Sequence, residues 1–337
     1  MTRVAVVGAG AAAAGAAYTL AATDAETVVF EARDRVGGRA ASATHDGVVY
    51  DYGANYVRDT AERPATFLRE AASPTDTPPP VDTFDETGTV SPGRDDDEAK
   101  WSTPEGVQAL VGRLLDAADA TVHTGAPVRR LVRTADGWRA DADPATGRFD
   151  AVVVTPPAPT TAELLARSDW DDPAREQLVA AARDVSYATV WSAALGYDRE
   201  LDRPYYALVC TADGTRASWF SRESCKPGHV PDGEVVIAQG GHEWSATHAD
   251  ADPAWAAGRL ADAASEVIGE PWLAAPAWAD AVCWEHALVE DQLLPGPRRA
   301  AAEAGLYPAG DWVAGEARVH AALASGIETG ERIALGG

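Results

Sequence analysis

Residues 3–22 read RVAVVGAGAAAAGAAYTLAA, and this stretch decides the fold of the N-terminal part of the chain. The β-branched run Arg3–Val7 predicts a short buried strand. A turn that contains glycine follows at once, and the small residues 14–22 predict a helix. A second apolar run at 27–30 predicts the next strand, so the order of elements is that of a parallel βαβ unit.

The turn between the first strand and the helix has the spacing of a dinucleotide-binding site. Gly8 permits the tight turn, Gly10 lets the backbone approach a pyrophosphate, and Ala13 is small enough for the helix to close on the strand. The unpaired N–H groups and the dipole at the start of the helix then favour phosphate. Glu31 ends the second strand, where a carboxylate accepts hydrogen bonds from a ribose diol and would repel the 2′-phosphate of NADP. A strand–helix turn that is only close-packed is the alternative interpretation.

The segment after the second strand indicates which dinucleotide binds. Residues 31–39 read EARDRVGGR, and this run resembles the FAD-dependent amine oxidase superfamily, whose second strand typically continues into an E-A-R-x-x-x-G-G-R segment. The resemblance implies that Gly37 and Gly38 let the backbone pass close to the cofactor phosphates. It also implies that Arg33 and Arg39 lie near the adenosine and the pyrophosphate. NAD dehydrogenases do not usually carry this segment, so the resemblance favours FAD as the cofactor.

The C-terminal part of the chain contains a second segment that resembles the same superfamily. Residues 305–312 read GLYPAGDW and predict a short strand, and a predicted helix over 318–335 follows. The strand ends at Gly310 and Asp311, and in the superfamily the matching aspartate binds the ribityl and pyrophosphate region. By the same resemblance Val319 would lie nearest the flavin ring, where a helix N-terminus stabilises negative charge on a reduced flavin. No cysteine lies near Asp311, so we expect the FAD to be bound non-covalently. A plain turn is the alternative interpretation of the Gly-Asp pair taken alone.

Three segments between these two also follow the pattern of the superfamily. Residues 121–128 resemble its third strand, in which the valine that contacts adenine corresponds to Val128. Residues 129–138 predict a hairpin with an Asp-Gly turn. Residues 151–157 match the strand that returns to the nucleotide sheet. The resemblance covers nearly the whole chain in order, and it is stronger at the two ends than in the middle.

These patterns predict an α/β fold with a Rossmann-like FAD-binding domain and a second, α+β substrate domain built on an antiparallel sheet. From about residue 159 short strands alternate with turn-rich segments, and a helix is predicted at 253–268. The FAD-binding domain is expected to be discontinuous, with residues 1–72, 105–158 and 284–337, and the substrate domain to contain residues 73–104 and 159–283. A small hairpin at 81–90 and a solvated acidic loop at 95–98 are expected within the substrate domain.

The charge of the chain argues against two classes of partner. The chain has 52 acidic and 28 basic residues, which gives a net charge of -24. Nucleic acids require a basic footprint and anionic membranes attract basic surfaces, so neither partner is expected. Only Lys100 and Lys226 of the basic residues are lysines. Together with the acidic excess, this choice of arginine predicts adaptation to high salt, where surface repulsion is screened. An ordinary acidic protein is the alternative.

The cysteines and the apolar segments predict a soluble, cytoplasmic protein. Cys210, Cys225 and Cys283 have no CxxC spacing and form no even framework, so we expect reduced thiols. No uninterrupted apolar run reaches the roughly 18 residues that a membrane-spanning helix needs.

The second half of the chain carries several of its 11 tryptophans. Aromatic walls suit a flat or aromatic small-molecule substrate stacked over a flavin, although any one tryptophan could be an ordinary core residue. Residues 225–228 (CKPG), residues 242–248 (HEWSATH) and Trp284 beside His286 resemble segments of the renalase-like branch of the superfamily. That branch passes a hydride from aberrant dihydronicotinamide dinucleotides to FAD and then electrons to O2, which gives H2O2.

Lys226 and Trp284 are the candidate catalytic residues. Lys226 could hold a water near flavin N5 or bind a substrate phosphate, and the alternative is a surface lysine in a Pro-Gly turn. No metal is expected, because His242 and His248 lack the partners and the spacing of a metal site. No GxSxG segment is present, so nucleophilic catalysis is not indicated.

The predicted function is that of an FAD-dependent oxidase. A hydride would pass from a CH–N donor to flavin N5, and O2 or another acceptor would reoxidise the flavin. The sequence has neither a second glycine fingerprint nor a CxxC disulfide, which favours this direct route. An amine oxidase and a protoporphyrinogen-oxidase-like desaturase are the enzymatic alternatives, and a catalytically silent flavin-binding sensor is the non-enzymatic one.

Overall fold

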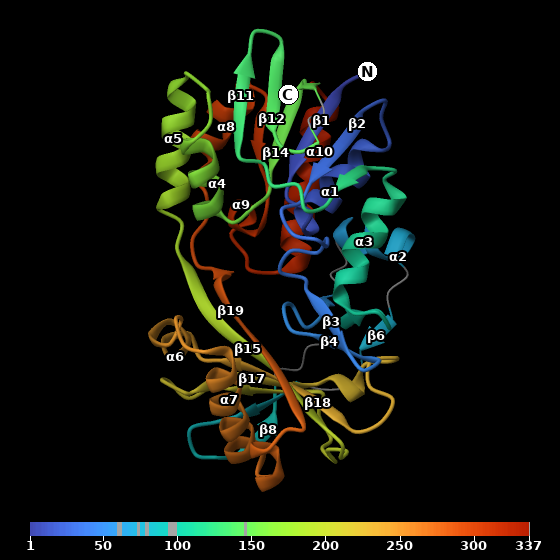
Figure 1. Ribbon diagram of the computed structural model, residues 1–337, viewed down its shortest axis with the longest axis vertical. Helices are drawn as coiled ribbons and strands as arrows, with labels where there is room; N and C mark the ends of the chain where they lie inside the picture. The colour runs from blue at the N-terminus through green and yellow to red at the C-terminus, as the bar shows by residue number, and fades with distance from the viewer. Residues whose placement is uncertain (59–62, 73–74, 78–80, 94–99, 145–146, 337) are drawn as a thin grey trace.

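The computed structural model describes residues 1–58, 63–72, 75–77, 81–93, 100–144 and 147–336. Figure 1 shows two lobes at opposite ends of an elongated molecule, joined by the long strands β15 (Tyr187–Tyr197) and β19 (Trp278–Val289). We call the end that contains β1 and β2 the nucleotide lobe and the other end the sheet lobe. The acidic run at 95–98 lies outside the described residues.

The nucleotide lobe is built on a five-stranded parallel sheet with the strand order β10-β2-β1-β14-β20. Its strands are β1 (Arg3–Val7), β2 (Glu26–Phe30), β10 (Thr121–His123), β14 (Ala151–Val154) and β20 (Leu306–Pro308). Most of their side chains are buried, because helices cover one face of the sheet and Leu131, Trp138 and Phe149 pack on the other together with helical residues. The predicted βαβ unit and the predicted C-terminal strand are confirmed, and they lie in one sheet.

Two helices from opposite ends of the chain pack closely in this lobe. Helix α1 (Ala11–Leu20) begins three residues and ends two residues before the bounds predicted for it, because it starts directly at Gly10. It lies against α10 (Val319–Ala334), which begins and ends one residue inside the predicted bounds. A Cβ atom added at Gly326 would collide with the carbonyl oxygen of Ala12, and one added at Gly15 would collide with the backbone of α10. Small residues in both helices therefore allow their backbones to touch.

The sheet lobe is built on a seven-stranded sheet with the strand order β19-β15-β18-β17-β16-β7-β8. Its shorter strands are β7 (Val81–Phe84), β8 (Val90–Pro92), β16 (Ala207–Cys210), β17 (Ala217–Arg222) and β18 (Glu234–Gly240). Only β7 and β16 pair in parallel, so the predicted antiparallel sheet is confirmed with one parallel pair. The predicted hairpin is formed by β7 and β8, and the predicted helix at 253–268 is α7 (Pro253–Ile268), which packs on one face of the sheet.

The other described elements are short. The strands are β3 (Ser42–His45), β4 (Val48–Asp51), β5 (Val57–Arg58), β6 (Thr75–Thr77), β9 (Lys100–Ser102), β11 (Arg130–Thr134), β12 (Gly137–Asp141) and β13 (Arg148–Phe149). The helices are α2 (Arg63–Ala72), α3 (Val107–Ala117), α4 (Ala158–Ala166), α5 (Pro173–Arg183), η1 (Glu223–Cys225), α6 (His242–Thr247), η2 (Pro271–Ala274), α8 (Pro295–Glu303) and α9 (Asp311–Ala314).

Helices α4 and α5 bear on the predicted division into domains. They follow the boundary expected at residue 159, yet Leu164 and Leu178 pack in the same core as Val28 and Phe30 of the nucleotide sheet. The apolar faces of α4 and α5 are buried in the core of the nucleotide lobe, so both helices belong to that lobe. We therefore propose that the sheet lobe begins with β15, and the other domain boundaries stay predictions. No helix within the described ranges is long and apolar enough to cross a membrane.

Candidate active site

The two glycine motifs of the nucleotide lobe lie against each other. Gly8, with φ of +91°, turns the chain out of β1, and an added Cβ there would lie 2.5 Å from a side-chain oxygen. Gly37 and Gly38 have φ of +113° and +61°, a region that favours glycine. Gly10 and Gly37 form a parallel bridge. The segments singled out in the sequence therefore form one continuous backbone surface.

The start of α1 offers the donors and the space that a pyrophosphate needs. Gly10 is the N-cap of the helix, and no side chain caps it. The N–H groups of the first turn therefore have no partner within the helix, and the helix dipole favours an anion there. A Cβ added at Gly10 would have no neighbour closer than 3.9 Å, so the space beside it is open. Ala13 is fully buried behind the turn. These residues fit a dinucleotide cofactor.

Glu31 and Arg33 lie beside the segment that carries Val128. The Glu31 carboxylate accepts hydrogen bonds from the N–H groups of Ala9 (2.8 Å) and Arg33 (2.9 Å). The N–H of Ala126 donates to the Glu31 carbonyl at 2.8 Å, and Val128 packs at the edge of the core of the nucleotide lobe. Each Glu31 oxygen keeps a further acceptor site that a ribose hydroxyl can use. Glu31 therefore shapes the turn around β1 as well as offering a contact for ribose.

Arg39 and Asp311 form an ion pair between the two ends of the sequence. Arg39 Nη2 lies 2.7 Å from Asp311 Oδ1, and Arg39 Nη1 donates to the carbonyl of His286 at 3.0 Å. Gly310, with φ of +143°, precedes the aspartate and donates its N–H to a serine of α10 at 3.1 Å. Val319 is the first residue of α10 and is partly exposed. The residues that the resemblance implied at the two ends of the chain thus lie in one place.

Lys226 is not a surface lysine. Its side chain is 0% exposed, and its Nζ lies 2.7 Å from Asp51 Oδ2 and 2.8 Å from Glu223 Oε1. The interpretation as a lysine exposed in a Pro-Gly turn is therefore wrong, because two carboxylates compensate the burial of the ammonium. This placement favours a structural role over contact with a substrate, and the catalytic role stays a prediction.

Trp284 lies in β19 where this strand passes between the lobes. Its Nε1–H donates to the Tyr52 carbonyl at 3.1 Å, and the two rings stack with centroids 5.7 Å apart. The Arg33 guanidinium lies 5.6 Å from the centroid of the Trp284 ring. Trp284 therefore lies next to a residue of the expected cofactor site. Its catalytic role also stays a prediction.

Comparison with known proteins identifies the family. Residues 6–71 match the NAD(P)-binding Rossmann-like domain, and residues 94–334 match flavin containing amine oxidoreductases. The second match covers more than half of the chain. The chain belongs to the flavin-containing amine oxidoreductase family. FAD is the cofactor that this family implies.

Solved structures share this fold. A proposed protoporphyrinogen oxidase from Exiguobacterium sp. 255-15 is 14% identical, with a TM-score of 0.79 and 99% of each chain covered. Cyclohexylamine oxidase from Brevibacterium oxydans IH-35A is 15% identical, with a TM-score of 0.73 and 99% of each chain covered. At these identities the similarity shows the fold alone. Mitochondrial protoporphyrinogen oxidase of Nicotiana tabacum is 42% identical over 66 residues, which are 20% of this chain and only 13% of that relative.

One segment of this flavoprotein, residues 52–56 (YGANY), was not singled out from the sequence. We call it the bridging segment, because it contacts both lobes. A Cβ added at Gly53 would collide with the Arg39 carbonyl, and the Ala54 N–H donates to the same carbonyl at 2.9 Å. On the other side, Gln239 Nε2 donates to the Gly53 carbonyl at 3.3 Å. The small pair Gly-Ala after a β-strand is the sequence signal that could have indicated this close approach.

The face of the seven-stranded sheet turned toward the nucleotide lobe supplies further site residues. Side chains alternate along a strand, so those of one face pack with α7 and those of the other face the bridging segment. Ser221 Oγ donates to Asn55 Oδ1 at 3.0 Å from this second face. Trp219 lies on the same face, with its ring 6.2 Å from that of Tyr56. Side chains of the sheet lobe therefore contact the bridging segment directly.

Two phenols near the site remain protonated at neutral pH. Burial raises the pKa of Tyr187, whose ring lies 5.9 Å from the Arg39 guanidinium. Burial and the Asp280 carboxylate raise the pKa of Tyr50, whose hydroxyl donates to Asp280 at 3.0 Å. Neither phenol is therefore a base in a neutral solution, and both act through packing and hydrogen bonds.

Proposed function

We propose that this flavoenzyme takes a hydride from a small, flat CH–N donor to flavin N5, and that O2 then reoxidises the flavin and gives H2O2. The donors that we favour are dihydronicotinamide isomers, as in the renalase-like branch. Bound FAD supplies the two-electron acceptor and the reaction with O2. The residues of the chain bind the donor, hold it in one orientation and exclude water.

The observation that carries this proposal is a cross-strand pair on the sheet face that covers the bridging segment. Trp219 of β17 lies directly opposite Gln239 of β18, and both side chains are partly exposed. Trp219 Nε1 is buried and finds no hydrogen-bond partner among the described residues. Gln239 uses its Nε2 on Gly53, whereas no described donor contacts its Oε1. Gln239 Oε1 thus offers an acceptor for the N–H groups of a primary carboxamide, and a rotation of the Trp219 ring would bring its unpartnered Nε1–H to the carboxamide oxygen.

Aromatic rings beside this pair suit the flat ring that carries such a carboxamide. Trp284 and Tyr52 are stacked at an interplanar angle of 25°, and Trp284 is partly exposed. Rings of this kind favour offset stacking with a planar ligand. A dihydronicotinamide combines a planar CH–N ring with a primary carboxamide, which is why we place this donor class first.

Simple amines are the second candidate class. The shared fold with cyclohexylamine oxidase supports it, and Gln239 Oε1 could accept an amine N–H. A protoporphyrinogen-like donor is supported by the fold of the Exiguobacterium protein and by the short match to the Nicotiana enzyme. The three donor classes are distinguished by which donor reduces the flavin when each is mixed separately with the protein.

The test is anaerobic mixing of the holoenzyme with one donor at a time, followed at the flavin absorption near ~450 nm. We expect dihydronicotinamide isomers to bleach this band within seconds and H2O2 to form when air is admitted. Bleaching by cyclohexylamine or by a porphyrinogen alone would overturn the donor assignment. A band that no donor bleaches would support the silent flavin-binding sensor. Acid precipitation of the protein should leave the FAD in the supernatant, since we propose non-covalent binding.

Substitution of Gln239 tests the carboxamide contact. Loss of one hydrogen bond to the donor in Gln239→Leu should raise KM about 10-fold and change kcat little. Gln292→Leu is the matched control, because Gln292 donates to the Val313 carbonyl (3.0 Å) outside the bridging segment. An unchanged KM in Gln239→Leu would contradict the proposed contact.

A further inference from the structure

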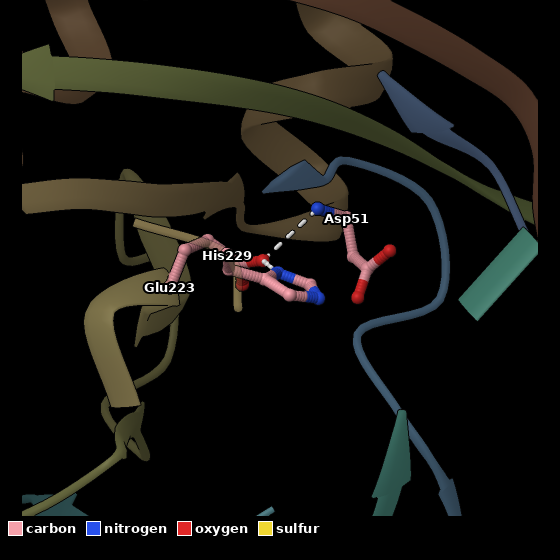
Figure 2. Close-up of side chains that lie close together, drawn as sticks. All are labelled: Asp51, Glu223 and His229. Carbon is pink, nitrogen blue, oxygen red and sulfur yellow. Dashed lines mark hydrogen bonds and ion pairs between the residues drawn. The ribbon is translucent and has the colours of Figure 1, made fainter. Parts of the chain in front are cut away.

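Four ionisable side chains are buried together where the two lobes meet. They are Asp51, Glu223, Lys226 and His229, and each side chain is 0% exposed. Beyond the two ion pairs of Lys226, His229 Nδ1 lies 2.8 Å from Glu223 Oε2. Figure 2 shows the Glu223 carboxylate between the backbone nitrogen of Asp51 and the ring of His229. We call these four residues the buried junction.

The side chains of the buried junction have hydrogen-bond or ion-pair partners. The two ring nitrogens of His229 both face oxygen acceptors, the Glu223 carboxylate and, at 2.8 Å, the carbonyl of Thr103. Each ring nitrogen of His229 therefore has a hydrogen-bond partner within or beside the junction. Burial alone lowers the pKa of the Lys226 ammonium, but Asp51 and Glu223 raise it by more, so it stays charged. The Lys226 ammonium therefore faces two carboxylates.

The Lys226 ammonium takes the place that a metal ion would otherwise fill. Ligand atoms of Asp51, Glu223 and His229 lie within 4.8 Å of one another, as the ligands of a metal site do. Lys226 Nζ lies within 2.8 Å of both carboxylates, so the cluster already contains its cation. Without that cation two buried carboxylates would repel each other strongly. The chain thus carries its own counter-ion at this position.

The buried junction ties three separate segments of the chain together. Asp51 ends β4 in the hairpin next to the nucleotide lobe, and its Oδ1 accepts from the N–H of Val107 at 2.8 Å, where α3 begins. Glu223 and Lys226 lie at η1, directly after β17 of the sheet lobe. His229 reaches from the sheet lobe to Thr103, just ahead of α3. A loss of the junction would therefore release the two lobes from each other at this point.

Asp51 leads directly into the bridging segment. Within that segment the Ala54 N–H donates to the Arg39 carbonyl at 2.9 Å, and Arg39 in turn holds Asp311 at 2.7 Å. From the sheet lobe, Tyr206 donates its hydroxyl to the Asn55 carbonyl at 3.5 Å. A displacement of Asp51 would therefore displace the bridging segment and, through it, Arg39 and Asp311, which are expected to contact FAD.

We propose that the buried junction is a positioning device for FAD, in which Lys226 holds Asp51 and Glu223 together and so keeps the bridging segment against Arg39. The four residues act through Arg39 and do not touch the cofactor. The proposal rests on FAD being the cofactor and is independent of which donor the enzyme oxidises.

The first experiment compares Lys226→Met with a control that loses stability elsewhere. In the full-length protein we would measure the melting temperature and the Kd of FAD after the cofactor has been removed. Loss of the cation should lower the melting temperature by about 5–15 °C and raise the Kd about 10-fold or more. Leu260→Ala removes a fully buried side chain of α7 and should lower the melting temperature while the Kd stays within about 2-fold. Equal FAD binding by Lys226→Met and wild type would overturn the proposal, and so would equal weakening by both variants.

Chemical rescue separates the cation from the rest of the lysine side chain. Lys226→Ala leaves space for methylammonium, which brings an ammonium group with N–H donors to the two carboxylates. We expect methylammonium to recover at least about half of the loss in FAD affinity, and tetramethylammonium, which lacks N–H donors, to recover none. If Lys226→Met does not fold, Lys226→Ala produced in methylammonium provides the same comparison when the amine is withdrawn. Equal effects of the two amines would overturn the proposal. These measurements need no substrate, so a wrong donor assignment would leave them unaffected.

Discussion

Arg39 and Asp311 stand 272 positions apart in the sequence and still share one hydrogen-bonded ion pair. Asp311 is only 4% exposed, so its carboxylate depends on the arginine for compensation of its charge. Gly310 sits directly before it in a conformation that few other residues adopt. Arg39 and Gly310 thus hold Asp311, a C-terminal residue of the expected cofactor site, in its position.

Removal of the arginine should therefore weaken FAD binding. We expect Arg39→Ala to raise the Kd of FAD about 10-fold or more, since both the ion pair and the bond to the His286 carbonyl are lost. Fluorescence titration of FAD-free protein measures this. Arg130→Ala is the control, because Arg130 forms exposed ion pairs with Asp141 and Asp169. A Kd that changes equally in both variants would contradict the role of Arg39.

The Cys210 thiol should couple stability to alkaline pH. Burial raises the pKa of this thiol to about 11, against ~8.5 in an unfolded chain. A raised pKa means that the stabilising effect is complete below the unfolded value and is lost as pH rises through the folded value. We expect the free energy of unfolding of wild type, relative to Cys210→Ala, to fall between pH ~8.5 and ~11. Urea unfolding at several pH values measures this, and a difference that stays constant over the range would refute it.

Among the secondary-structure elements, the contact between α1 and α10 decides how the two ends of the chain meet. Gly326 stands at the point where the backbones touch, while Gly258 of α7 is exposed with no neighbour near its added Cβ. Replacement of glycine by alanine should therefore lower the stability of the protein at the contact of α10 with α1 and raise it in α7. This contact also brings Val319, at the start of α10, against the core cluster that contains Ala9 and Ala12.

Gly326→Ala should destabilise the protein by about 1–3 kcal/mol, because the methyl group collides with the Ala12 carbonyl. Gly258→Ala should stabilise it by about 0.5–1 kcal/mol, since alanine loses less conformational entropy in an exposed helix. Urea unfolding of both variants gives the two signs. Stabilisation by Gly326→Ala would show that the helices can separate without cost.

Over the whole molecule, a net charge of -24 dominates the long-range electrostatics. Many of the arginines lie in surface ion pairs, such as that between Arg113 and Glu105 at 2.7 Å, which contribute little individually. The excess of acidic groups repels itself in the folded state, and salt screens this repulsion. Adaptation to high salt stays a prediction, but its thermodynamic consequence can be measured.

The melting temperature should rise as NaCl is increased from 0.1 M toward 1 M, with most of the gain complete once the Debye length is ~3 Å. Sucrose at matched osmolality is the control, because it stabilises proteins without screening charge. A melting temperature that is flat or falls with salt would argue for an ordinary acidic protein.

Local sequence was sufficient for the nucleotide half of the fold. The strand Arg3–Val7, the turn through Gly8 and Gly10 and the small helix after it were all predictable, because each depends on residues a few positions apart. The family could be predicted in the same way from residues 31–39, and the match over 94–334 confirms it. The antiparallel sheet of the second half followed from the alternation of short strands and turns.

Only the tertiary structure decided which distant residues share a site. The register between β17 and β18 sets Trp219 opposite Gln239, and no local pattern reveals a register. The burial of Lys226 depends on the Asp51 carboxylate from a distant segment as well as on Glu223 three residues before it, so its sequence context suggested a surface position. Strands and turns follow from backbone preferences that act over a few residues. The bridging segment and the buried junction exist because packing brings charges and hydrogen-bonding groups from both lobes together, and that energy appears only when the chain is folded.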